Sequence, residues 1–129
     1  MTNITHDIGV AKQIGFYSDA IETRGNVRWL HTSGTPGLSG DAKFPVDFAA
    51  QAELAWRHIV SKLEKAGMGV NDLVKITQYL TRESDIAAYR PIRARVLGDA
   101  RPASMLMVVA ALPQPGWLIE IEAIAAKDA

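Results

Sequence analysis

The sequence predicts one α+β domain over residues 1–129, a mixed β-sheet with two helices on one face. A length of 129 residues suits one ordinary domain, and 48% hydrophobic with 22% charged residues indicates a globular chain. The expected elements follow the order hairpin, helix, strand, helix, strand, strand. An apolar stripe marks the first helix, and a continuously apolar run marks a strand near the C-terminus.

The first third of the chain predicts a hairpin and then a loop. Apolar and polar residues alternate between residues 13 and 32, and Arg24-Gly25-Asn26 is typical of a turn between two extended runs. Residues 33–40 contain too much glycine for regular structure, so we expect a loop there. A backbone cradle for an anion is the alternative, but the segment lacks a phosphate-binding lysine, so a turn-rich connection is favoured.

Residues 47–67 predict the first helix. Asp47 can cap its start, and Gly67 can take the left-handed position that closes it. One apolar stripe recurs at three- and four-residue spacing, which predicts the face that packs on the sheet. Its members are Phe48, Ala52, Ala55, Trp56, Ile59, Leu63 and Ala66.

A strand and a second helix follow. Residues 73–80 have the β-branched content of a strand. We expect a helix from Ser84 to near Gly98, with Pro91 kinking or splitting it. The strand-helix-strand segment over residues 73–112 should cross over right-handedly.

The last third predicts self-association. Residues 105–112 are continuously apolar, so as a strand they would present apolar side chains to both faces of the sheet. Two helices can cover only one face, so the other face needs a partner subunit. A turn at residues 113–116 and a final strand from Trp117 to Ala125 complete the expected fold.

Charge and cysteine content exclude several functions. Fourteen basic residues balance fourteen acidic ones, whereas a nucleic-acid-binding protein normally carries a basic excess. The absence of cysteine excludes disulfide scaffolds, thiolate metal sites and cysteine nucleophiles. The N-terminus lacks the apolar core of a signal peptide, and no apolar run approaches the roughly 20 residues of a membrane span. We therefore expect a cytoplasmic protein without nucleic-acid or membrane partners.

The histidines do not predict a metal site. His6, His31 and His58 fall on a terminus, a strand and a helix, and none has a helical histidine partner four residues away. No nucleophile elbow, Walker loop or dinucleotide-binding glycine motif is present.

Two carboxylates are the first candidates for chemistry. Glu120 and Glu122 lie two residues apart in the final strand, so both side chains project from the same face of the sheet. A solvated polar face is the simpler interpretation. If a neighbouring subunit covers this face, one carboxylate is partly desolvated, and its raised pKa suits proton transfer through water.

A series of short motifs spans nearly the whole chain. They are Ile14-Gly15-Phe16-Tyr17, Thr32-Ser33-Gly34, Ala50-Gln51 and Ala66-Gly67 in the first helix, Asp72-Leu73-Val74-Lys75-Ile76-Thr77, Pro102-Ala103-Ser104, Leu112-Pro113 and Ile119-Glu120-Ile121-Glu122-Ala123-Ile124-Ala125. In this order and spacing they resemble the Rid proteins, also called YjgF or endoribonuclease L-PSP proteins. The resemblance implies a chorismate-mutase-like fold and a homotrimer packed through its sheets, with small-molecule clefts between subunits.

The resemblance also implies a chemistry. The best-known members hydrolyse reactive enamines and imines, such as 2-aminoacrylate, to keto acids and ammonia without a cofactor. In that reaction an arginine binds the substrate carboxylate through two hydrogen bonds, and a glutamate positions the attacking water. Carried onto this sequence, the glutamate is Glu120, the cleft tyrosine is Tyr17 and the serine at a strand end is Ser33.

The expected carboxylate-binding arginine is replaced by Ser104. This exchange removes about 2 to 4 kcal/mol of substrate binding, so we expect the usual activity to fall by roughly 30- to 1000-fold or vanish. Leu106 makes the expected cleft more apolar. Arg90 and Arg101 are candidates for a relocated positive charge, although a helix-surface role for Arg90 and a solvated position for Arg101 are the simpler interpretations.

Three functions remain open. The first is hydrolysis of an altered enamine-like or imine-like metabolite, with Glu120 handling water. The second is a non-catalytic ligand-binding or regulatory trimer that uses the same clefts. The third, an endoribonuclease, comes only from the historical family name, and zero net charge without a histidine pair argues against it.

Overall fold

The computed structural model describes residues 2–129. Its strands and helices are β1 (Asn3–His6), β2 (Ala20–Thr23), β3 (Val27–His31), β4 (Thr35–Pro36), α1 (Phe48–Lys65), β5 (Leu73–Leu80), α2 (Ile86–Leu97), β6 (Ala103–Val108) and β7 (Ile119–Asp128). Short 3-10 turns precede β5 and α2, and another lies between β1 and β2.

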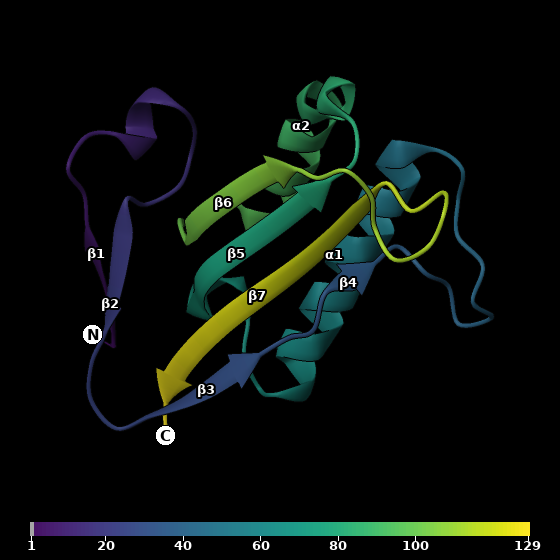
Figure 1. Cartoon of the computed structure of the whole chain (residues 1–129). Helices are drawn as coiled ribbons and strands as arrows, with labels where there is room; N and C mark the ends of the chain where they lie inside the picture. The colour runs from purple at the N-terminus through teal and green to yellow at the C-terminus, as the bar shows by residue number, and fades with distance from the viewer. Residues whose placement is uncertain (1) are drawn as a thin grey trace.

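The main sheet has five strands in the order β3-β7-β5-β6, with the two-residue β4 also paired to β7. β5 and β6 run parallel, whereas β7 is antiparallel to β3, β4 and β5. Both helices lie on the same side of this mixed sheet (Figure 1). The α+β class and the two-helix layer predicted from the sequence are confirmed.

The predicted hairpin was wrong in its pairing. The turn at Gly25 exists, with φ at +90°, but the strands on either side of it join different sheets. β2 pairs with β1 in a separate two-stranded sheet, and β3 pairs with β7. Alternating apolar residues identify an extended strand without identifying its partner, and β3 finds its partner almost a hundred residues later in the sequence.

In the last third of the chain, β6 is shorter and β7 is longer than the sequence predicts. β6 begins at Ala103 and ends at Val108, because β5, the strand it pairs with, ends at Leu80. β7 starts two residues later than predicted and continues to Asp128, since β3 pairs with this extension. Within the predicted loop after Thr32, β4 adds two residues that pair with β7.

Both helices agree with the sequence pattern. The Asp47 side chain accepts a hydrogen bond from the Ala50 N–H at 3.0 Å, and Gly67 closes the helix with φ at +70°. α2 runs through Pro91 as one continuous helix, so the predicted split does not occur. A 3-10 turn over residues 83–85 leads into α2, which ends before Gly98.

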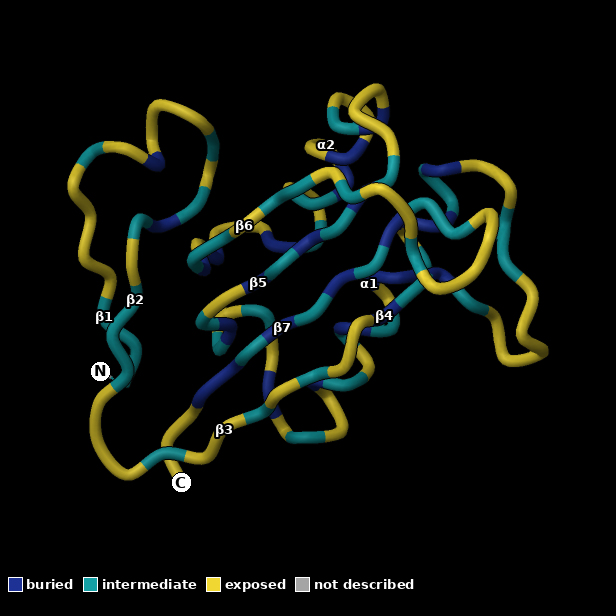
Figure 2. The backbone as a smooth tube through the Cα atoms, in the orientation of Figure 1, coloured by how far each residue is buried: buried dark blue, intermediate teal, exposed yellow. Residues whose placement is uncertain are grey.

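The core lies between the helix layer and the sheet, where Figure 2 shows the buried stretches of α1, β5 and β7. Trp56, Ile59 and Leu63 of α1 are fully buried, as the apolar stripe predicted. Their partners on the sheet come from alternate positions of β5 and β7, namely Ile76, Leu80, Ile119, Ile121 and Ala123. α2 contributes Tyr89, Ile92 and Leu97.

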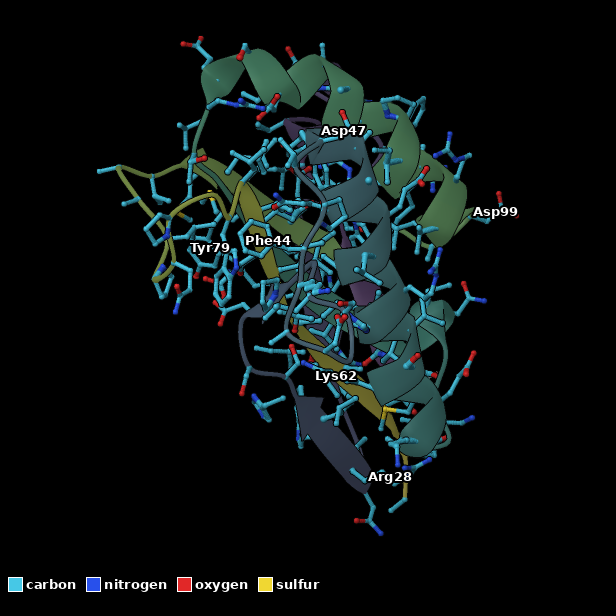
Figure 3. All side chains as sticks on the ribbon, turned by 90° about the vertical axis from the view of Figure 1, so that its right-hand side faces the viewer. Arg28, Phe44, Asp47, Lys62, Tyr79 and Asp99 are labelled. Atoms are coloured by element: carbon cyan, nitrogen blue, oxygen red, sulfur yellow. The ribbon has the colours of Figure 1, made fainter. Side chains whose placement is uncertain are left out.

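The opposite sheet face carries no helix within residues 2–129, as Figure 3 shows from the side, with Tyr79 away from α1. Trp29 and Met105 are half exposed there, at 50% and 48%. The register places Met107 beside Tyr79 on this same face, whereas Leu106 pairs with buried Gln78 and faces the helices. The apolar run therefore supplies side chains to both faces, as predicted.

Gly37 permits a close contact between the glycine-rich loop and α1. A Cβ atom at this position would overlap the backbone oxygen of Gln51 and lie 2.8 Å from its Cα atom. We predict that Gly37→Ala lowers the free energy of unfolding by about 1 to 3 kcal/mol, because helix backbone cannot move aside cheaply. Urea denaturation measures the change. The matched control is Gly40→Ala in the same loop, where a Cβ meets nothing within 4 Å, and an equal loss in both variants would contradict the prediction.

Candidate functional site

Glu120 lies in β7 on the sheet face that the helices leave open. Ile119 and Ile121 on either side of it are fully buried against the helices, so the predicted alternation is confirmed. Burial first, and then the negative charge of Glu122, raises the pKa of the Glu120 carboxyl above its usual 4.5. A carboxylate with a raised pKa is a better acceptor for a proton from water than an ordinary surface carboxylate.

Gly34 packs directly against this carboxylate. A Cβ at Gly34 would lie 2.8 Å from Oε1 of Glu120, so a larger residue at this position would push the carboxylate aside. Ser33 immediately precedes it and is exposed. The structure thus brings together Glu120 and the strand-end segment that carries Ser33.

Glu122 has a different role from Glu120. Its Oε1 accepts a hydrogen bond from the Tyr79 hydroxyl at 2.6 Å, and this bond raises the pKa of Tyr79. Within residues 2–129, no side chain or backbone donor forms a hydrogen bond with the Glu120 carboxylate. Of the two carboxylates, Glu120 is therefore the one left free for a substrate or a water molecule.

The other predicted site residues gather in a groove between β6, α2 and the loop before β2. Tyr17, Arg90, Ser104 and Leu106 all line this groove, whose volume is about 370 Å³. Arg93, which the sequence did not single out, lines it as well. We call it the β6–α2 groove.

Arg101 lies apart from this set, in an adjoining groove that shares Arg90 and Arg93 with the first. Its guanidinium donates hydrogen bonds to the carbonyls of Gly98 and Ala100 at 2.7 and 2.9 Å, which satisfies backbone acceptors after the end of α2. The same group lies 5.3 Å from the centroid of the Phe16 ring.

Within one chain, the two halves of the predicted site are separated. On β5, buried Ile76 and Gln78 face the helices, and Thr77 and Tyr79 face the open side. Ser104 pairs with Ile76, whereas Glu120 pairs with Tyr79, so their side chains point to opposite faces of the sheet. One copy of the chain therefore does not bring the Ser104 hydroxyl to the Glu120 carboxylate.

A buried polar network holds Ser104 in place. The Trp56 indole N–H donates to the Tyr89 hydroxyl at 3.2 Å, and that hydroxyl donates to Oε1 of Gln78 at 2.7 Å. The Gln78 amide then donates to Oγ of Ser104 at 3.0 Å and to the carbonyl of Met105 at 2.8 Å. In the sequence, Gln78 indicates this network, because it is a polar residue at a core-facing position of β5 where the other core-facing residues are apolar.

Asp19 fixes the loop that forms one wall of the groove. Its carboxylate accepts hydrogen bonds from the backbone N–H groups of residues 8 to 11, at distances from 2.7 to 3.4 Å. These bonds, led by the one from Ile8, lower the pKa of Asp19. The loop is therefore held by an ionised carboxylate at neutral pH.

Two further predictions concern metals and membranes. The described part of the chain holds no group of three or more His, Cys, Asp or Glu side chains placed to bind a metal ion. Neither helix within residues 2–129 has the length and apolar character that a membrane span requires.

Several known protein sequences are similar to this chain. The family model of Endoribonuclease L-PSP matches residues 9–127. A RutC family protein of Pyrococcus horikoshii is 36% identical over 119 residues, which cover 91% of each chain. TdcF of Escherichia coli, which is named as a candidate reactive intermediate deaminase, is 30% identical over 104 residues. This match covers 78% of this chain and 80% of TdcF.

Solved structures share the fold. YyfB of Yersinia pestis, described as a Rid family protein of unknown function, has a TM-score of 0.84 and 26% identity, covering 97% of this chain and 98% of its own. TdcF of Escherichia coli, solved with bound serine, has a TM-score of 0.72 and 27% identity, covering 89% of this chain and 91% of its own. The matches in sequence and in structure show that the chain belongs to the Rid/YjgF family, the family also known as Endoribonuclease L-PSP.

Proposed function

We propose that this protein hydrolyses a small enamine or imine in a cleft that a second copy of the chain completes, within a homotrimer. The observation that carries this proposal is the position of Glu120. Its carboxylate is half-buried and has a raised pKa, and no donor within residues 2–129 forms a hydrogen bond with it. The naming of TdcF as a candidate reactive intermediate deaminase supports the reaction class.

Glu120 with Ser33 forms one half-site, and the β6–α2 groove forms the other. Their separation in one copy supports a cleft shared between two copies. Glu120 and Ser33 lie on the open sheet face, and Arg90 and Ser104 lie in the β6–α2 groove. A second copy packed against the open face would set its own groove beside Glu120. Half-exposed Trp29 and Met105 give that face the apolar character that subunit contacts require.

The proposed reaction needs only water and a proton acceptor. The Glu120 carboxylate takes a proton from water as the water oxygen bonds to the imine carbon, and the C=N π electrons pass to nitrogen. Glu120 returns this proton to nitrogen, which gives a carbinolamine. The hydroxyl proton then moves to nitrogen through the same carboxylate, the C–N bond breaks with its electron pair leaving on ammonia, and the oxygen electrons form the carbonyl group. An enamine enters the same path after a proton moves to carbon and gives the imine.

Two measurements test the proposal. Sedimentation should give three times the mass of one chain, and a panel of imino acids and uncharged imines should show release of ammonia above the rate in buffer. A chain that sediments as a monomer would refute the shared cleft. Tight binding of panel compounds without turnover would favour the alternative, a non-catalytic ligand-binding or regulatory trimer.

A further inference from the structure

We infer that Lys62 of α1 is a positioning residue for the half-site that Glu120 forms with Ser33. Through the side chain of Thr35, it holds the backbone of Ser33 and Gly34 beside the carboxylate. The inference rests on the proposed function in one respect, since it concerns the geometry in which Glu120 activates water. Lys62 acts through Thr35 and not by contact with the reacting atoms.

Two consecutive hydrogen bonds link α1 to this segment. Lys62 reaches from α1 to β4 (Figure 3), where its Nζ donates to Oγ1 of Thr35 at 2.7 Å. The Thr35 hydroxyl, in a residue only 3% exposed, donates in turn to the carbonyl of Ser33 at 2.9 Å. In its charged form a lysine amine has only donors, so the Thr35 oxygen accepts that bond and has its own hydrogen left for Ser33. Lys62 thereby sets the direction of both bonds.

The Lys62 amine has no partner of opposite charge. Within residues 2–129, none of the ion pairs formed by lysine, arginine and histidine includes Lys62. Burial lowers the pKa of this amine below its usual 10.5. A partly buried amine loses hydration, and the hydrogen bond to Thr35 offsets part of that cost. The amine is therefore committed to the Thr35 hydroxyl and not to an acidic side chain.

The link ends next to Glu120. The Ser33 carbonyl belongs to the peptide group that joins Ser33 to Gly34, and this group is planar. Fixing the carbonyl therefore fixes the direction in which the backbone enters Gly34. A Cβ at Gly34 would lie 2.8 Å from Oε1 of Glu120, so the Gly34 backbone borders the carboxylate directly. Loss of the link frees the backbone that forms this border.

Backbone pairing alone holds the segment weakly. β4 has only two residues, and Pro36, which pairs with Glu120, has no N–H to donate to the ladder. Gly34, just before β4, has more backbone freedom than any other residue type. The side-chain link to α1 therefore supplies an anchor that this short ladder lacks.

Lys62→Met tests the positioning role, because methionine keeps an unbranched apolar stem and removes the amine. We expect kcat for imine hydrolysis to fall by about 5- to 50-fold while KM stays within about 3-fold, since the backbone beside Glu120 loosens and the β6–α2 groove is unchanged. Thr35→Val removes the hydroxyl and should give the same pattern. Thr35→Ser restores the hydroxyl and should keep kcat within about 3-fold of the wild type. A loss in Thr35→Ser equal to that in Thr35→Val would contradict the inference.

A double variant and a control separate the link from general damage to the fold. If Lys62 acts through Thr35, the combination of Lys62→Met with Thr35→Val should lose no more activity than the larger single loss. Lys65→Met is the matched control, because Lys65 is an exposed lysine of the same helix, and it should keep wild-type kcat. Losses that multiply in the double variant, or an equal fall of kcat in Lys65→Met, would overturn the inference.

A measurement on the backbone does not depend on turnover. NMR order parameters of Ser33 and Gly34 should fall from about 0.85 in the wild type to below about 0.6 in Lys62→Met, and stay near 0.85 in Lys65→Met. If they fall while the wild type hydrolyses no panel compound, the proposed reaction fails and the positioning role stands. If the wild type hydrolyses an imine and Lys62→Met changes neither kcat nor the order parameters, the positioning role fails and the reaction stands. Unchanged order parameters in Lys62→Met overturn the inference in either case.

Discussion

Glu120→Gln is expected to lower kcat for imine hydrolysis by about 100-fold or more, because the amide retains the shape of the side chain but cannot take a proton from water. Steady-state release of ammonia from the best compound of the panel measures the loss. Glu64→Gln is the matched control, since Glu64 is an exposed carboxylate on α1 and should leave kcat unchanged. Equal rates in Glu120→Gln and the wild-type enzyme would remove Glu120 from the mechanism.

The same carboxylate sets a pH dependence. Glu120 acts in its ionised form, so kcat/KM should fall as the pH drops through its pKa, and burial places that fall above pH 4.5. Glu122 contributes to the raised pKa through its negative charge. Glu122→Gln should therefore move the acid side of the profile to lower pH, and a shift in the opposite direction would contradict this electrostatic assignment.

Trp56→Ala is expected to lower the free energy of unfolding by about 3 to 5 kcal/mol. Trp56 is fully buried between the helices and the sheet, and its indole N–H donates to the Tyr89 hydroxyl. Removing the ring leaves a cavity and removes one donor from the network that ends at Ser104. Denaturant unfolding at fixed protein concentration measures the change.

A second variant retains part of the buried side chain. Trp56→Phe keeps one aromatic ring and removes the rest of the indole together with its N–H donor, so it should cost clearly less than Trp56→Ala. A loss below about 1 kcal/mol in Trp56→Ala would mean that the site collapses around the missing ring, contrary to the close packing of the core.

Much of the fold follows from local patterns. The spacing of apolar residues placed α1, and alternation placed Glu120 and Glu122 on the open face, because both depend only on the period of one element. The pairing of β3 with β7 did not follow, since strand period carries no information about a distant partner. Pro91 was expected to kink or split α2, and the helix continues through it without a split.

The site was harder to predict than the fold. The resemblance assigned Glu120 and Ser104 to one site, but it did not show that they project from opposite faces of the sheet in one copy. Arg93 was missed because its contact with Gln78 crosses from α2 to the sheet, which no pattern within a helix reveals. Of the two arginines that were considered, Arg90 lines the groove with Ser104, whereas Arg101 lies in the adjoining groove.

Mixed oligomers of two inactive variants test the shared site most directly. Glu120→Gln removes one half-site, and Arg90→Glu reverses an exposed charge in the other, so each variant alone should have little activity. If the two halves come from different copies, refolding an equal mixture should restore about a quarter of the wild-type rate, because half of the copies supply each intact half-site. A mixture no more active than the two variants measured separately would show that the site does not form between copies of the chain.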